Sequence, residues 1–358
     1  MKKKSLVILF IFILSACSNA ISLESTPTPV IVEEQNQVEV QNEAVVSPSP
    51  EPFQFSLPTP GAEPISSWRP PLYPVPWAIA PYDHFFFTRP IAADQINWPI
   101  ADYRYGGVFF GINVVHTGVD IPSPEGTPIM AAGAGTVVWA DWGLFAQTPG
   151  NQSDPYGLAV AIRHDFGYND GQLYTIYAHM SMMNVIVGQY VETGDVIGFV
   201  GSTGATTGPH VHFEVRMPNN SFFYTYNPEL WIAPPQGWGV LAGRIMNTKG
   251  ELLQQMEVTV TPEAGGSTFT VRTYGKGGAV NPDPYYQENM VLGDLPAGIY
   301  KVTFKYEDKR MQTWVEIFPG QVSYFTFTGE KGFDSIRPPA ATLDFIPLIL
   351  PATSTPQP

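Results

Sequence analysis

The sequence predicts an all-β protein with two β domains, a larger antiparallel one followed by a small β-sandwich. Proline and glycine are abundant, with 36 and 33 residues among 358, and this favours turns and short strands over long helices. No stretch between residues 68 and 238 keeps an apolar face at helical spacing over ten residues. Apolar residues make up 44% of the chain and aromatic residues 13%, so a sizeable core can be buried.

Runs of β-branched and aromatic residues separated by glycine predict the strands of the larger domain, residues 67–237. These runs have the length and composition of strands; they are Gly135–Ala140, Ala159–His164, Leu173–His179 and His210–Arg216. The small β-sandwich is expected over residues 238–330, where turn signals recur roughly every eight to twelve residues. Its expected strands include Gly243–Met246, Val258–Val260, Tyr300–Phe304 and Tyr324–Phe327.

Residues 1–16 have the pattern of a secretory signal peptide. Three lysines at positions 2–4 precede a nine-residue apolar run, which is too short for the roughly 20 residues that span a bilayer. Small residues then precede Cys17, the only cysteine in the chain, in a pattern that resembles a bacterial lipobox. The resemblance implies a lipoprotein of the cell envelope, lipid-anchored through Cys17 on the outer side of the membrane. The alternative is an ordinary secretory signal with an incidental cysteine.

A disordered tether is expected over residues 17–66 and a proline-rich tail over residues 331–358. Positions 18–66 contain eight prolines and seven glutamates, with no lysine or arginine. Because this stretch has no apolar periodicity, burial cannot repay the entropy of ordering it. Such a tether could hold the β domains off a membrane and within reach of a cell wall.

Charge and residue counts exclude several classes of function. The net charge of −14 argues against a nucleic-acid partner, which needs a basic face. A single cysteine excludes disulfides within the chain and paired-cysteine metal sites. No lysine occurs between Lys4 and Lys249, so no lysine-based chemistry can operate in the larger domain.

The candidate chemistry lies in the six histidines. His210 and His212 stand two residues apart in an expected strand, so their side chains project from the same face. His116 and Asp120 lie in a turn that leads into a strand, flanked by glycine and proline. A histidine and a carboxylate beside such a pair can supply a zinc site with three protein ligands and an open fourth position, and zinc lowers the pKa of water bound there.

Three motifs, in this order, resemble the lysostaphin-type (LytM-like) zinc metallopeptidases of bacterial cell walls. They are His116-Thr117-Gly118-Val119-Asp120, Tyr177-Ala178-His179-Met180, and the run from Gly201 to Val215 that contains His210-Val211-His212. The resemblance assigns His116, Asp120 and His212 as zinc ligands. It assigns His179 and His210 as catalytic residues that activate water and stabilise the oxyanion. It also implies a compact antiparallel β fold with a groove over the zinc.

The function implied is a membrane-anchored Zn²⁺ endopeptidase that hydrolyses peptide bonds in peptidoglycan stems or cross-bridges. The resemblance covers roughly residues 86–231. A protein of the same fold that binds the cell wall or activates an amidase without turnover is the alternative, and loss of any of the five site residues would favour it. All five are present. A third possibility is that the β-sandwich is an adhesion or glycan-binding module.

Other residues carry weaker expectations. The connection Asp141–Gly157 is longer than usual for the family, and such loops often wall the groove. His84 is expected to be structural, and His164 to lie at the surface or behind the site. Glu214 shares the strand face of the histidine pair and could orient a zinc ligand. The aromatic residues of 68–98 are expected to serve packing more than glycan binding.

Overall fold

The computed structural model describes residues 70–91, 103–108, 115–275, 277–334 and 338. The signal peptide, Cys17, the tether and most of the tail lie outside the described residues. Within the described part of the chain, no helix combines the length and apolarity needed to cross a membrane. The all-β class expected from the sequence is confirmed, because strands and two short 3₁₀ helices, Phe222–Tyr224 and Pro228–Leu230, make up the described elements.

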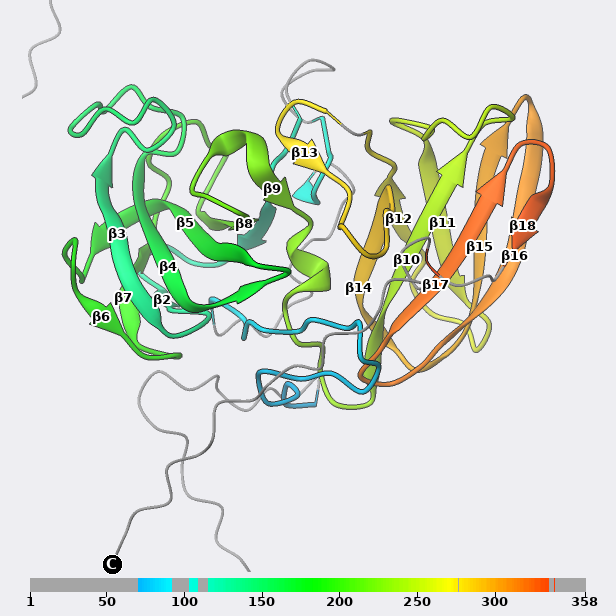
Figure 1. Cartoon of the computed structure of the whole chain (residues 1–358), viewed down its shortest axis with the longest axis horizontal. Coiled ribbons are helices and arrows are strands. Elements are labelled where there is room, and N and C mark those ends of the chain that lie inside the picture. The colour runs from blue at the N-terminus through cyan, green and yellow to red at the C-terminus, as the bar shows by residue number, and fades with distance from the viewer. Residues whose placement is uncertain (1–69, 92–102, 109–114, 276, 335–337, 339–358) are drawn as a thin grey trace, which may run out of the picture. The chain divides into compact units, whose positions relative to one another are not determined.

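The larger domain is built on one ten-stranded sheet with the order β13-β9-β8-β5-β4-β3-β6, to which β1, β2 and β7 are joined (Figure 1). All of its pairs are antiparallel except β13 with β9. Its strands are β1 (Val119–Pro122), β2 (Pro128–Met130), β3 (Gly135–Trp142), β4 (Leu158–Tyr168), β5 (Gly171–Met183), β6 (Tyr190–Val191), β7 (Val196–Val200), β8 (His210–Arg216), β9 (Thr225–Tyr226) and β13 (Val280–Asn281).

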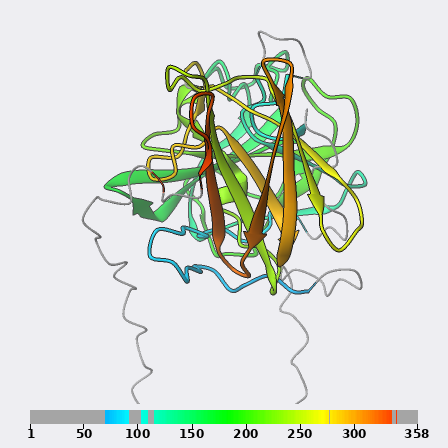
Figure 2. The same cartoon turned by 90° about the vertical axis from the view of Figure 1, so that its right-hand side faces the viewer.

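Two four-stranded sheets follow, with the orders β14-β10-β17-β18 and β12-β11-β15-β16. Their strands are β10 (Trp238–Met246), β11 (Glu257–Pro262), β12 (Phe269–Arg272), β14 (Met290–Pro296), β15 (Gly298–Tyr306), β16 (Lys309–Ile317), β17 (Val322–Thr328) and β18 (Gly332–Asp334). Apolar side chains of both sheets form one buried cluster, so the sheets pack as a sandwich, whose strands face the viewer in Figure 2. Each strand quoted from the sequence lies within one of these elements.

The sandwich and the larger domain share a core. Val240 and Ala242 of β10 and Val291 of β14 belong to the same buried cluster as Phe87 and Trp231. The strand β13 sits in the chain between β12 and β14 of the sandwich, yet it pairs with β9 of the larger sheet. The two sets of strands are therefore parts of one folded body.

One buried ion pair crosses the same boundary, and a second buried ion pair reaches across it through a hydrogen bond. Arg89, in the segment that precedes the first strand, contacts Asp294 of β14 at 2.7 Å. Arg104 contacts Glu229 at 2.6 Å, and the same Glu229 carboxylate accepts the backbone N–H of Gly293 at 2.6 Å. In these two pairs each buried side-chain charge has a partner of opposite sign, which a buried ion requires.

The described part of the aromatic N-terminal segment serves packing, as expected. Phe85 and Phe87 are fully buried in the shared core, and Phe86 is nearly so. His84 is also buried, and its ring lies 4.2 Å from that of Trp231. This segment fills the space between the larger sheet and the sandwich.

Trp231 is the largest fully buried side chain of this core. We expect Trp231→Ala to lower the free energy of unfolding by about 3–5 kcal/mol, because a large cavity is left behind. Trp314→Ala is the matched control: this side chain is 53% exposed, so its loss should cost less than about 0.5 kcal/mol. Urea unfolding followed by tryptophan fluorescence measures both. Equal costs for the two variants would contradict the shared core.

Candidate metal centre

The pairing of β1 with β8 brings the expected site residues together. In this antiparallel pair Asp120 lies opposite His212, and Pro122 lies opposite His210. Residues directly opposite on one face have neighbouring side chains. His116 precedes β1, and hydrogen bonds between its backbone and that of Gly106 and Gly107 hold it beside the strand. The sequence prediction that His116 lies in a turn entering a strand, with the histidine pair on one strand face, is confirmed, whereas Asp120 lies within the strand itself.

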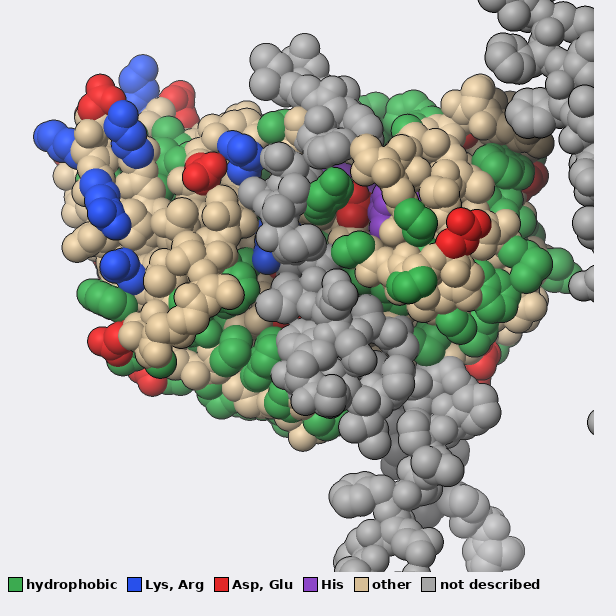
Figure 3. Space-filling view, turned by 180° about the vertical axis from the view of Figure 1, so that it is seen from behind, with side chains coloured by type: hydrophobic (Ala, Val, Ile, Leu, Met, Phe, Trp, Pro, Cys, Tyr) green, Lys and Arg blue, Asp and Glu red, His purple; other side chains and the backbone are tan. Residues whose placement is uncertain are grey.

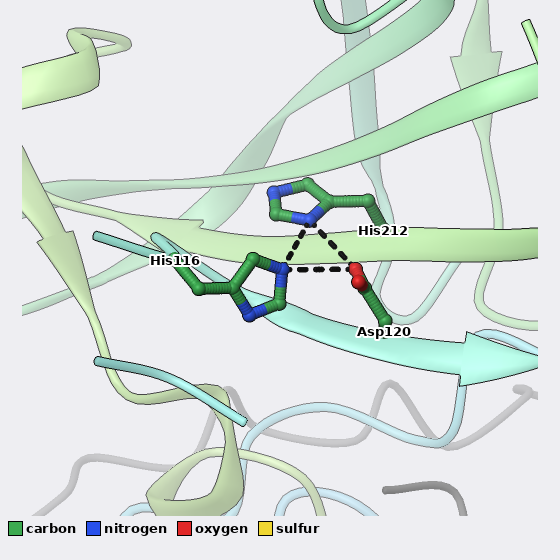
Figure 4. A group of neighbouring side chains, drawn as sticks. All are labelled: His116, Asp120 and His212. Carbon is green, nitrogen blue, oxygen red and sulfur yellow. Dashed lines mark hydrogen bonds and ion pairs between the residues drawn. The ribbon is translucent and has the colours of Figure 1, made fainter. Parts of the chain in front are cut away.

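Three ligand atoms from these residues converge on one point (Figure 4). Nε2 of His116 lies 2.9 Å from Oδ1 of Asp120 and 3.0 Å from Nδ1 of His212. Nδ1 of His212 lies 2.9 Å from the same Asp120 oxygen. In the described part of the chain, this is the group of His, Cys, Asp or Glu residues whose ligand atoms are close enough together to hold one ion.

Hydrogen bonds on the far side of each ring leave lone pairs facing the centre. Nδ1 of His116 lies 3.0 Å from the carbonyl oxygen of Arg104, which can only accept, so this nitrogen carries the proton. Nε2 of His212 lies 3.0 Å from Oε1 of Glu214, which assigns the proton to Nε2 by the same reasoning. The inner nitrogens and the Asp120 carboxylate are then three acceptors in contact, an arrangement that a cation between them would stabilise.

The pKa values of Asp120 and His212 are shifted in directions that favour the charged form of each side chain. Burial raises the pKa of Asp120, but the charges and hydrogen bonds of His116 and His212 outweigh burial and hold it well below its usual range. Burial lowers the pKa of His212, but hydrogen bonds to Asp120 and Glu214 outweigh it and raise the pKa to about 9.

These residues fit zinc. Two imidazole nitrogens and one carboxylate oxygen are a donor set of catalytic zinc sites, which leave a fourth position open. Tetrahedral bonds of ~2.0–2.1 Å need ligand atoms about 3.3 Å apart. The observed separations of 2.9–3.0 Å are only a few tenths of an ångström shorter, which small rotations of the side chains supply.

His210 and His179 lie beside this group, as the resemblance implies. Nε2 of His210 is 3.5 Å from Oδ1 of Asp120, and the rings of His210 and His179 are 4.7 Å apart. Each ring is fixed through Nδ1, which donates to the carbonyl oxygen of Gly208 in one case and of Thr203 in the other, both at 2.8 Å. Burial lowers the pKa of both imidazoles, that of His179 to about 3, so both are neutral near pH 7.

A backbone kink directs His179 into the site. Up to Ala178 the strand β5 pairs with β8, and from Met180 it pairs with β7. Between them His179 has φ +63°, a left-handed conformation that costs a non-glycine residue energy. Its backbone N–H is satisfied by the carbonyl oxygen of Tyr156 at 2.9 Å. The strain is stored where the chain changes strand partner at the site.

A groove of about 310 Å³ opens over these residues, and its walls are mainly apolar. The connection between β3 and β4, expected from its length to wall the groove, does so through Phe145, Pro155 and Tyr156. Asp154 orders this loop by accepting the backbone N–H groups of three of its residues. Figure 3 shows histidine beside an acidic side chain on this face of the molecule.

The other candidates have separate places. His84 and His164 are buried and do not line the groove, so His164 is not a surface residue. Glu214 is fully buried and contacts His212, as its position on the strand allowed. Burial raises the pKa of Glu214, but the neighbouring Arg216 and His212 outweigh it and lower the pKa to about 2. Tyr156, which contacts Glu214, was not found from the sequence, since a loop residue carries no periodic signal.

Comparison with known proteins agrees with this site. Residues 114–223, which include all five site positions, match Peptidase family M23. The His-Asp-His group is the donor set of a metallopeptidase, and the segment that carries it is similar to the M23, lysostaphin-type peptidases.

Individual relatives match over this region. DD-carboxypeptidase/endopeptidase Mpg of Neisseria meningitidis serogroup B is 41% identical over 132 residues, which are 37% of this chain and 26% of that protein. Lysostaphin of Staphylococcus staphylolyticus is 33% identical over 187 residues, 52% of this chain and 36% of that protein. The solved catalytic domain of lysostaphin from Staphylococcus simulans is 35% identical, with 35% of this chain and 86% of that one covered and a TM-score of 0.30. The chain spans only about a quarter to a third of the length of these two curated relatives.

The ligand assignment predicts roughly one zinc ion per purified chain. Asp120→Asn should lower the zinc affinity at least a hundredfold, because a neutral amide replaces the anionic ligand between two imidazoles. Asp170→Asn, at an exposed turn, is the matched control and should bind zinc like the wild type. Competition with a chromophoric chelator measures the affinities. Wild-type affinity in Asp120→Asn would contradict the assignment.

The buried His164, which does not line the groove, should make the stability of the protein depend on pH. Burial lowers its pKa from 6.5 to about 4, so below pH 6.5 the unfolded chain binds the proton that the folded chain refuses. Its contribution to stability is therefore full above pH 6.5 and falls, by at most about 3 kcal/mol, as the pH drops to about 4. Unfolding measured across this range should show a smaller loss in His164→Gln than in the wild type. If the free energy of unfolding falls equally with pH in both proteins, His164 is not the origin of the effect.

Proposed function

We propose that this protein is a zinc endopeptidase that hydrolyses peptide bonds in peptidoglycan stems or cross-bridges and is held at the cell envelope by lipid on Cys17. The observation that carries the proposal is the intact group of His116, Asp120 and His212, with His179 and His210 beside it in one groove. The family match over residues 114–223 supports the same chemistry.

The three ligand residues would hold the ion, and the protein around them would set its environment. A zinc ion supplies Lewis-acid chemistry, since it polarises a peptide carbonyl and lowers the pKa of water toward ~7. His116 and His212 would offer their inner nitrogens to the ion. The outer N–H group of His116 donates to the carbonyl oxygen of Arg104, and that of His212 donates to the carboxylate of Glu214. The apolar walls of the groove keep bulk water away from the reacting peptide.

His179 and His210 would move the proton. Nδ1 of each ring donates to a backbone carbonyl, so Nε2 carries the lone pair. As water attacks the carbonyl carbon, one Nε2 takes its proton and then donates it to the nitrogen of the leaving amine. The two fixed rings thus need no rearrangement during the reaction.

The names of the relatives bear on the substrate. One relative is a carboxypeptidase and endopeptidase and the other is lysostaphin, and both match over the domain that carries the groove. In the described lining of the groove, Asp120 is the one residue with an acidic or basic side chain other than histidine. Without a lysine or arginine to bind a terminal carboxylate there, the described walls favour internal peptide bonds.

The lipid anchor rests on the sequence before residue 18. Cys17 follows an apolar run and small residues, as in a bacterial lipobox, and the proline-rich residues 18–66 separate it from the β domains. More than one acyl chain on Cys17 would make the anchoring stable. The tether would then let the groove reach peptidoglycan from the membrane surface.

A test of the catalytic roles separates metal binding from turnover. His210→Ala should keep zinc and lose activity on purified peptidoglycan by about 10²–10⁴-fold, because the proton acceptor is removed while the ligands remain. Ser202→Ala, an exposed position in the preceding loop, is the control and should retain activity. Mass spectrometry of the released fragments measures turnover and identifies the bond.

Undiminished fragment release by His210→Ala would refute the proposed role. A zinc-loaded wild type that binds peptidoglycan and releases no fragment would refute the enzyme itself and indicate a wall-binding protein.

The anchor predicts a change of location. Cys17→Ser should move the protein from the membrane fraction to the soluble extracytoplasmic fraction or leave it unprocessed, because the thiol that receives lipid is gone. Ser18→Ala is the adjacent control and should remain with the membrane. Metabolic labelling with a radioactive fatty acid gives the second readout. Labelled, membrane-bound Cys17→Ser protein would contradict the anchor.

A further inference from the structure

A fully buried carboxylate lies directly behind the ligand group. Glu214 is on β8, two residues beyond His212, so both side chains project from the same face of the strand. Its exposed area is zero. A buried charge is costly unless it is paired and hydrogen-bonded, so its contacts account for its presence.

One oxygen of this carboxylate is the meeting point of three segments. Oε1 of Glu214 accepts from Nε2 of His212 at 3.0 Å and from the hydroxyl of Tyr156 at 2.5 Å. The hydroxyl of Thr117 donates to the same oxygen. Thr117 follows the ligand His116, and Tyr156 ends the loop that walls the groove. A single acceptor therefore joins the strand, the ligand turn and the groove wall.

The other oxygen is neutralised by a buried arginine. Oε2 of Glu214 accepts from Nε of Arg216 at 2.7 Å and contacts its Nη2 at 2.6 Å. The Nη2 of Arg216 also donates to the hydroxyl of Tyr156 at 2.8 Å. This donation leaves the tyrosine proton free to point at Glu214. The arginine thus keeps the carboxylate ionised and fixes the direction of the tyrosine hydroxyl.

The ligand turn packs tightly on this network. A Cβ added to Gly118 would collide with the backbone oxygen of Phe213, and would lie 3.0 Å from both Cγ of Glu214 and Cε1 of His212. Contacts this close leave no room for a side chain at that position. The glycine between Thr117 and Asp120 therefore lets the turn approach near enough for the Thr117 hydroxyl to reach the carboxylate.

We infer that Glu214 is the positioning residue of the metal centre, and that Tyr156 and Thr117 hold it in place. The inference rests on the proposed zinc-dependent function and deepens it. Because an ionised carboxylate can only accept, Glu214 requires the proton of His212 on Nε2 and leaves Nδ1 for the metal. Its bonds to Thr117 and Tyr156 couple the spacing of the ligands to the loop that shapes the groove.

Zinc affinity and the spectrum of the cobalt-substituted protein test this network. Glu214→Gln should weaken zinc binding about ten- to a hundredfold, the usual cost of losing such a partner. Tyr156→Phe removes one hydroxyl but keeps the Glu214–Arg216 pair, and should weaken binding about three- to tenfold. Both should shift the visible absorption bands of bound cobalt, which report the geometry of the ligands. Tyr300→Phe, whose hydroxyl bonds a backbone carbonyl in the sandwich, is the matched control and should change neither.

The threonine gives a conservative pair. Thr117→Val keeps the shape and loses the hydroxyl, so it should weaken zinc binding; Thr117→Ser keeps the hydroxyl and should restore it. If Glu214→Gln does not fold, Tyr156→Phe and the Thr117 pair decide the question. Wild-type affinity and an unchanged cobalt spectrum in these variants, with or without a loss of thermal stability, would overturn the inference while leaving the proposed enzyme intact. A wild-type protein that binds no zinc would instead overturn the proposed function.

Discussion

The antiparallel pairing of β1 with β8 is the constraint on which the site depends. It places Asp120 opposite His212, so that a carboxylate and an imidazole from distant parts of the chain share one face at contact distance. The turn before β1 then adds His116, and alternation along β8 adds His210. A slip of one residue in this register would turn both β8 histidines toward the opposite face. The chemistry is thus a consequence of strand register.

The strand register brings the site residues together, and hydrogen bonds to acceptors around the site fix the orientation of their rings. Each of the four histidines gives one ring proton to a carbonyl or carboxylate outside the group, and this fixes its plane and leaves the other nitrogen facing inward. The backbone of His179 is also fixed, because this residue is held in a left-handed conformation at the point where β5 changes its partner strand. Such fixed groups are arranged before a substrate binds, which reduces the reorganisation that the reaction requires. The shared core, which includes Trp231 and residues of β1, β5 and β8, supports this arrangement.

Local sequence patterns predicted many of the strands and the site residues. The contacts that they did not predict depend on packing between residues far apart in the chain. The run His210–Arg216 is a strand with the bounds expected, because β-branched residues and alternation are local signals. The family motifs supplied the five site residues. The partnership of Tyr156 with Glu214, the pairing of β13 with β9 and the burial of Arg89 against Asp294 had no such signal, since each joins residues far apart in the chain. The domain boundaries and the signal and lipid assignments stay predictions.

The central claim is that His116, Asp120 and His212 together bind one zinc ion. X-ray absorption of the zinc-loaded protein tests it most directly, because the scattering identifies the atoms around the metal. We expect nitrogen and oxygen neighbours at about 2.0–2.1 Å, with the outer-shell scattering of two imidazole rings. That ring scattering should fall to one imidazole in the His116→Ala protein if it still loads zinc. A zinc shell of oxygen alone, or one unchanged by that substitution, would contradict the account.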